Sequence, residues 1–155
     1  MHYLLNNNFK KLINMKFLDL NGVKYLLTKI KANFGTTIVN ASDYRTKLDN
    51  TGKISIPFVA KHQIVNMDLS NNINVCDWFQ KASKGGILEI VFAGAQGGYI
   101  FCNANNNTYM YKMQVSSHGP MLNKIDHLET EYNNYVRLIK IDDTRLVVAE
   151  FIQNK

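Results

Sequence analysis

Residues able to do acid–base, nucleophilic or metal chemistry are few and scattered in this sequence. The histidines and cysteines occur in no His-x-His, His-Glu-x-x-His or Cys-x-x-Cys spacing of the kind that metal and redox sites use. They are His2, His62, His118, His127, Cys76 and Cys102. No serine or cysteine stands in a turn that would expose a nucleophile. The pattern predicts a protein that is not an enzyme and that uses no metal and no cofactor.

Carboxylates occur in two settings where chemistry is conceivable. Asp126, His127, Glu129 and Glu131 are close in sequence and could bind an ion, but a solvated acidic segment is the simpler interpretation. Glu89 interrupts a run of apolar residues. Because an unpaired buried carboxylate is costly, we expect Glu89 to have a partner or to face outward or into an interface.

One loop combines groups that suit a sugar ligand. Rings stack on sugar faces and amides bond sugar hydroxyls, and residues 103–108 place Asn105 and Asn106 close to Tyr109 and Tyr111. The alternative is an asparagine-rich hairpin loop beside tyrosines that are buried in the core. Exposure of the two rings separates the alternatives.

A basic amphipathic helix is predicted over Gly22–Phe34. Its apolar residues recur at helical spacing on one face and are Val23, Leu26, Leu27, Ile30 and Phe34. The opposite face carries mainly lysines, and Gly35 can end the helix. A helix this short is not stable alone, so we expect its apolar face to be covered by its own chain or by sister chains.

Most of the remaining chain has strand periodicity. Strands are expected at Thr36–Val39, Lys53–Phe58, Gln63–Leu69, Ile87–Ala93, Tyr99–Asn103, Tyr109–Val115, Tyr135–Ile141 and Arg145–Ile152. A short helix is expected at Ile73–Ser83, with Trp78 in the core, and residues 121–134 suit either a helix or an extended loop. Residues 94–98 are predicted to form a hairpin turn. The fold expected is mainly β with an N-terminal helix (α+β), its C-terminal domain an antiparallel β-sandwich or jelly roll.

The net positive charge is confined to the first third of the chain. Residues 1–53 hold nine Lys and Arg against three Asp and Glu, whereas residues 54–155 hold nine of each. A lysine-rich helix face is usually solvated, and docking on an acidic surface is the next choice. Nucleic acid is an unlikely partner because no arginine cluster accompanies the lysines. No apolar run approaches the roughly 20 residues that cross a bilayer, so no membrane insertion is expected.

Two phrases in the first third resemble a known family. Residues 18–31 read Leu-Asp-x-Asn-Gly-Val-x-Tyr-Leu-x-x-Lys-Ile-Lys, and residues 40–50 read NASDYRTKLDN. Both are similar to segments near the start of fibre and baseplate proteins of tailed bacteriophages. The resemblance covers about a third of the chain and implies no catalytic residue.

The resemblance implies a structural protein of a phage virion, made in the cytoplasm of a bacterial host. Its type would be a tail fibre, a baseplate protein or a head fibre or decoration subunit. Residues 1–50 would mount and oligomerise the protein, commonly as a trimer, and residues 51–155 would form a β-rich head. Other virion proteins and a host surface glycan would be its partners, with receptor binding by the head. The alternative is a small phage- or plasmid-encoded protein whose basic first third binds nucleic acid or a host protein.

Overall fold

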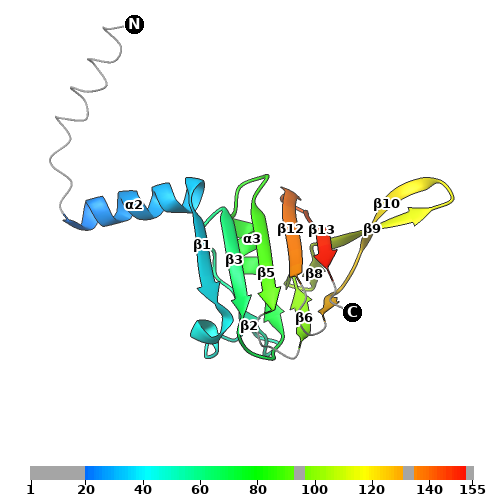
Figure 1. The fold of residues 1–155 in the computed structure, drawn as a ribbon, viewed down its shortest axis with the longest axis horizontal. Coiled ribbons are helices and arrows are strands. Elements are labelled where there is room, and N and C mark those ends of the chain that lie inside the picture. Colours follow the sequence, from blue (N-terminus) through cyan, green and yellow to red (C-terminus); the bar gives the residue numbers. More distant parts are fainter. Residues whose placement is uncertain (1–19, 93–96, 131–134, 153–155) are drawn as a thin grey trace, which may run out of the picture.

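The protein has a two-layered β body from which one helix and one hairpin project. A computed structural model describes residues 20–92, 97–130 and 135–152, with the side chains of residue 29 and residues 31–34 left out. Helix α2 (Leu20–Phe34) extends from one edge of the body, and a β-hairpin extends from the opposite edge (Figure 1).

The larger layer is a mixed sheet. In spatial order its strands are β1 (Thr36–Asn40), β3 (His62–Met67), β5 (Ile87–Phe92), β12 (Tyr135–Asp142), β13 (Arg145–Ile152), β9 (Met110–Ser116) and β10 (Gly119–Lys124). β1, β3 and β5 run parallel to one another, and β13 is parallel to β9. The β5–β12, β12–β13 and β9–β10 pairs are antiparallel.

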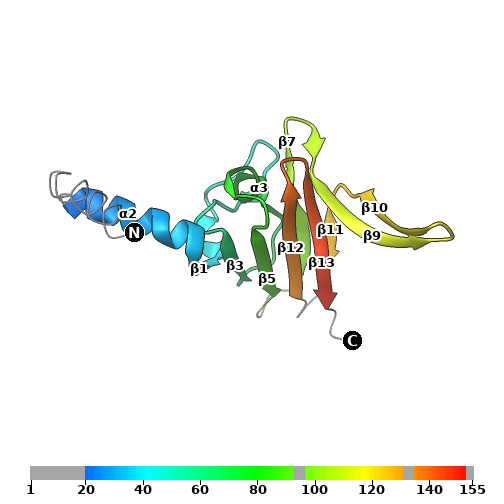
Figure 2. The same ribbon diagram turned by 90° about the horizontal axis from the view of Figure 1, so that it is seen from above.

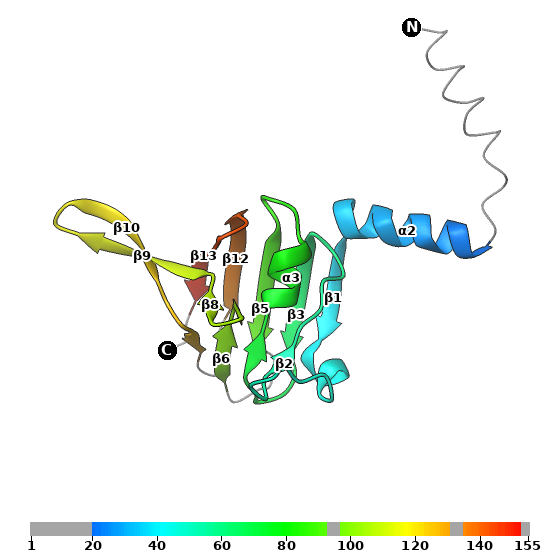
Figure 3. The same cartoon turned by 180° about the vertical axis from the view of Figure 1, so that it is seen from behind.

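The smaller layer covers one face of the large sheet. Its strands, in spatial order, are β11 (Leu128–Thr130), β6 (Gly98–Phe101), β4 (Ile73–Asn74) and β2 (Ile54–Ser55). Helix α3 (Cys76–Lys81) lies on the same side (Figure 3). A two-stranded hairpin, β7 (Asn103–Ala104) and β8 (Asn107–Thr108), and a 3-10 turn, η1 (Ala41–Tyr44), complete the body.

The core lies between the two layers. Alternate residues of β3, β5 and β12 point into it, as the strand period requires, and meet the inner residues of the small sheet. Trp78 is fully buried in this core, as the sequence predicted, and its indole N–H donates to the Ala60 carbonyl at 2.9 Å. The opposite face of β1, β3, β5, β12 and β13 is covered by no element in the described part of the chain (Figures 1 and 2). We call it the open face.

The mainly β class and the N-terminal helix are confirmed, but the antiparallel sandwich or jelly roll is wrong in its topology. Both sheets contain parallel pairs. The reason is the length of the connections: η1 and β2 lie between β1 and β3, and β4 and α3 lie between β3 and β5. Such crossovers return the chain in the same direction, as parallel pairing needs.

Individual elements follow the predictions where the periodicity was strong. The C-terminal hairpin is confirmed with the expected pairing of β12 and β13. The hairpin expected across residues 94–98 is not formed, because β5 lies in the large sheet and β6 in the small one. Within residues 121–134, where a helix or an extended loop was expected, residues 121–124 belong to strand β10 and residues 128–130 form strand β11. Those strands owe their conformation to pairing with β9 and β6.

Residues 36–50 pack with the β body. β1 forms an edge of the large sheet, and Val39 and Ala41 belong to the core. Residues 20–34 are the part that projects (Figure 1). The division of the chain near residue 50 stays a prediction about independent folding.

Candidate ligand-binding site

The loop singled out in the sequence is a tight hairpin turn. Asn105 and Asn106 connect β7 to β8 with positive φ angles of 50° and 63°. Two-residue hairpins with both residues in this region favour asparagine and glycine, because asparagine tolerates the left-handed conformation. The local conformation therefore explains part of the asparagine run, and both side chains are exposed.

A second turn faces this hairpin. Leu48 and Ile54 pair antiparallel around it, and Asp49 organises it from within. One carboxylate oxygen of Asp49 accepts the backbone N–H of Thr51 at 2.8 Å, the Thr51 hydroxyl at 2.7 Å and the backbone N–H of Lys53 at 3.0 Å. Partial burial, the largest single influence, raises the pKa of Asp49, but hydrogen bonds from Asn74, Lys53 and Thr51 outweigh it and lower the pKa to about 2.

The buried side chain of Asn74 joins the two turns. Its amide nitrogen lies 2.8 Å from the other carboxylate oxygen of Asp49 and 2.9 Å from the backbone carbonyl of Asn103. Its amide oxygen accepts the backbone N–H of Cys76 at 3.1 Å and that of Asn103 at 3.3 Å. The amide nitrogen and the amide oxygen of Asn74 both make hydrogen bonds, and together they hold the two turns at a fixed separation.

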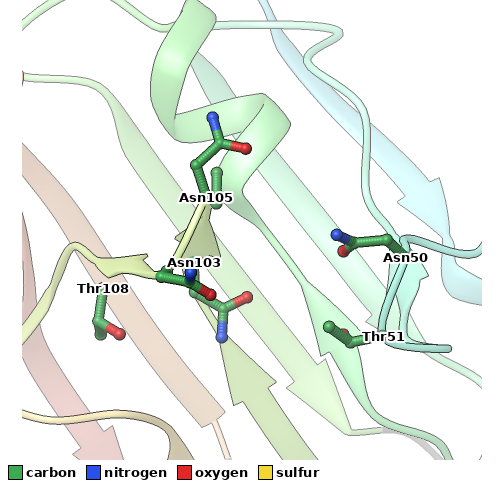
Figure 4. A pocket seen from close by; sticks show the side chains of 7 residues that line it. Asn50, Thr51, Asn103, Asn105 and Thr108 are labelled. Atoms are coloured by element: carbon green, nitrogen blue, oxygen red, sulfur yellow. The ribbon is translucent and has the colours of Figure 1, made fainter.

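The two turns enclose a polar pocket of about 170 Å³. Figure 4 shows Asn50 and Thr51 on one side and the side chains of the β7–β8 hairpin on the other. The lining contains amide and hydroxyl groups with no charged side chain: Asn50, Thr51, Asn103, Ala104, Asn105, Asn106 and Thr108. Amides and hydroxyls both donate and accept hydrogen bonds, so the pocket suits an uncharged ligand with several hydroxyl groups.

The tyrosines expected to stack on a ligand are not among the residues that line the pocket. The ring of Tyr109 packs against the core at 5.1 Å from the ring of Phe79, and it is half-buried. Tyr111 pairs with Val147 in the large sheet. For Tyr109 the structure therefore favours the alternative of core packing.

A different aromatic surface adjoins the pocket. Phe101 lies on the outer side of β6 with its ring centroid 5.4 Å from that of His127 and 6.4 Å from that of Tyr99. The ammonium group of Lys53 lies 4.3 Å from the centre of the Phe101 ring and hydrogen-bonds to Thr51, which lines the pocket. Lys53 therefore connects the aromatic surface to the pocket wall.

Sequence reasoning missed Asn74, Thr51 and Phe101. The Asp49–Gly52 turn was recognisable from its residues, but Asn74 is 25 positions from Asp49 and 29 positions from Asn103, the two residues that it joins. No local pattern reports such separations. In comparisons with known proteins, no family model, curated protein or solved structure matches this chain.

Glu89 forms a separate polar cluster on the open face. Its carboxylate lies 2.5 Å from His62 Nε2, 3.5 Å from an Arg137 nitrogen, and accepts the Tyr135 hydroxyl. The Tyr135 hydrogen bond is the largest influence and lowers the pKa of Glu89; burial opposes it, while His62 and Arg137 lower it further. His62 Nδ1 is also 3.0 Å from the Thr36 hydroxyl. The expectation of a partner for Glu89 is confirmed.

In the described part of the acidic segment near residue 126, side chains contact neighbouring rings and form no cluster that could hold an ion. Glu129 accepts the Tyr99 hydroxyl at 3.4 Å, and His127 packs on Tyr99. Glu131 lies outside the described residues. Within the described ranges, no three His, Cys, Asp or Glu side chains gather closely enough to hold a metal ion.

The apolar face of α2 is exposed. Val23 is 40%, Leu26 47%, Leu27 51% and Ile30 47% accessible, and the side chain of Phe34 lies outside the described part. No helix of the described part is long and apolar enough to cross a bilayer. The exposed stripe leaves the predicted oligomerisation surface available for contacts with other chains.

Proposed function

We propose that this chain is a non-enzymatic structural subunit of a tailed-phage virion, which assembles through α2 and presents its β body to a surface glycan. The observation that carries the proposal is the exposed apolar stripe of a helix that projects from the body (Figure 1). A 15-residue helix is marginal in water without packing, so this helix needs partner chains to hold it.

The amide pocket supports the second half of the proposal. Sugar hydroxyls need paired donors and acceptors, and the lining supplies them from Asn50, Thr51 and the β7–β8 hairpin. Lys53, which bonds to Thr51 in the pocket wall, also contacts the ring of Phe101. This ring offers an apolar surface of the kind that sugar rings stack on. A neutral lining favours a neutral glycan over an anionic one.

The oligomer is tested by light scattering on the full chain. We expect a discrete trimer that dissociates in the Leu26→Asp/Ile30→Asp variant, because two carboxylates on the stripe oppose its burial. The matched control, Asn21→Asp/Thr28→Asp, places the same groups on the other side of the helix and should stay assembled. A monomeric parent protein would end the proposal of assembly through α2.

The alternative function, binding of nucleic acid by the basic first third, can be tested on the same samples. A nucleic-acid-binding protein would retain DNA in a manner that falls steeply with salt, as release of counterions requires. The virion subunit should form its oligomer without regard to DNA. Salt-sensitive DNA retention by a monomer would favour the alternative.

A further inference from the structure

The β9–β10 hairpin projects from the body as an arm with one apolar side. Cross-strand pairs place Tyr111 opposite Lys124, Met113 opposite Leu122 and Val115 opposite Pro120 on one side. Met113 is 60% and Val115 82% accessible, and the arm lies clear of the body (Figure 1). A two-stranded ribbon is marginally stable alone, so packing its apolar side against another surface would stabilise the arm.

The apolar side of the arm continues the open face of the large sheet. Tyr111 pairs with Val147, and Val147 pairs with Ile139, so all three project from the same side. From the arm to the far edge this side carries apolar residues interspersed with polar ones. The apolar residues are Leu122, Val115, Met113, Tyr111, Val147, Ile139, Ile152, Val91, Ile87, Ile64 and Ile38, of which Val147 is only 8% accessible. The arm and the open face therefore form one continuous surface, apolar on the arm and mixed on the sheet.

We propose that this surface docks on the same surface of a second copy of the chain. The charges on it are three carboxylates, Glu89, Glu150 and Asp142, and three cations, Arg137, Arg145 and Lys124, with His62 beside them. Arg137 lies 3.3 Å from Glu150 and 3.5 Å from Glu89. A face with balanced charge meets its own copy without repulsion, whereas it offers no net charge to an acidic or a basic partner.

The polar cluster does not oppose this docking. Glu89 already has Tyr135, His62 and Arg137 as partners, so covering it leaves no carboxylate unpaired. A second sheet can then pack over it at the usual face-to-face distance of about 10 Å.

The area is also sufficient for a pair of copies. With strands about 4.8 Å apart and about 3.3 Å per residue, the five strands of the open face and the arm span about 700 Å². Stable interfaces bury from about 600 Å² upward on each partner. The arm lies at the opposite edge of the body from α2, so the two surfaces can be used together (Figures 1 and 2).

Sedimentation velocity on the full chain tests the docking. The Leu26→Asp/Ile30→Asp variant removes the contribution of α2, and in this background we expect a dimer. Adding Met113→Asp should raise the dimer dissociation constant at least tenfold. Adding Met121→Asp, an equal change on the polar side of the same arm, should leave the dimer intact, since Met121 is similarly exposed at 51%.

Two results would overturn the proposal. One is a monomer in the α2 background at every concentration, and the other is an equal effect of Met113→Asp and Met121→Asp. A measurement on the unaltered chain does not depend on whether the aspartate variants fold. In the dimer, limited oxidation by peroxide should spare Met113, which is covered, and modify Met121, which is not. Equal oxidation of the two methionines would also reject the docking.

Discussion

The amide nitrogen of Asn74 lies 2.8 Å from a carboxylate oxygen of Asp49, and this contact holds the two walls of the polar pocket together. Asn74 belongs to a buried strand, whereas Asp49 belongs to a surface turn. Because the other end of Asn74 bonds the backbone at Cys76 and Asn103, the pocket is attached to the core and not to a free loop.

Replacing Asn74 should destabilise the protein more than the loss of an ordinary surface asparagine does, because its side chain bonds several other groups. Asn74→Leu leaves the buried backbone groups of Cys76 and Asn103 without a partner, which we expect to lower the free energy of unfolding by about 2–4 kcal/mol. Asn123→Ala, which removes an exposed hydrogen bond to Gln114, should change it by about 0.5 kcal/mol or less. Urea denaturation of both variants measures the difference. Equal, small effects would show that Asn74 does not anchor the turns.

Stability should depend on the ionisation of Asp49 in acid. The folded pKa, about 2, is below the usual value of 3.8, so this carboxylate stabilises the fold above about pH 4. The contribution is lost as the pH falls through about 4 to 2, where the folded form also becomes protonated. The free energies of unfolding of the parent chain and of Asp49→Asn, measured at a series of pH values, should therefore converge as the pH falls over this range. A difference that stays constant down to pH 2 would contradict the pKa.

Ligand contact through the hairpin can be separated from its folding. Glycine adopts the positive φ of Asn105 and Asn106 without strain, so Asn105→Gly/Asn106→Gly keeps the turn and removes both amides. We expect glycan-array or cell-adsorption signals to fall about tenfold or more with little change in melting temperature. Tyr109→Ala is the contrasting variant, since its ring packs on Phe79 and its loss should lower the melting temperature. Unchanged binding by the double glycine variant would place the contact site elsewhere.

The two cysteines should be unreactive in the folded protein. Cys76 and Cys102 are buried and free, and burial raises the pKa of Cys102, which lowers its thiolate population. A thiol reagent such as Ellman's reagent should label neither residue at neutral pH within minutes, and both in denaturant. Rapid labelling without denaturant would show that this part of the core opens.

Fragments test where the independently folding unit begins. The packing of β1, Val39 and Ala41 predicts that residues 35–155 give one cooperative melt with a β-rich circular dichroism spectrum. Residues 53–155 lack this strand and the Asp49 turn, so they should melt at a lower temperature or aggregate. Equal stability of the two fragments would restore the division near residue 50.

The sequence by itself determined the local structure of this protein. The apolar spacing of α2, the alternation in β3, β12 and β13, and the turn at Asp49 are all visible in neighbouring residues, because each depends on side chains within a few positions. The asparagine hairpin was likewise placed correctly, since Asn105 and Asn106 suit its backbone.

Only the tertiary structure decided how these elements pair and which side chains meet. Parallel pairing of β1 with β3 and β3 with β5, and the separation of β5 from β6, depend on crossovers that no local pattern encodes. The position of the ring beside the amides depends on packing in the same way: Tyr109 follows the loop in sequence, and its ring packs against Phe79 in the core. Phe101 comes close to the pocket through Lys53, across 48 positions of chain. Strand order brings distant residues together, and a single sequence records that order only through the energy of the whole packed core.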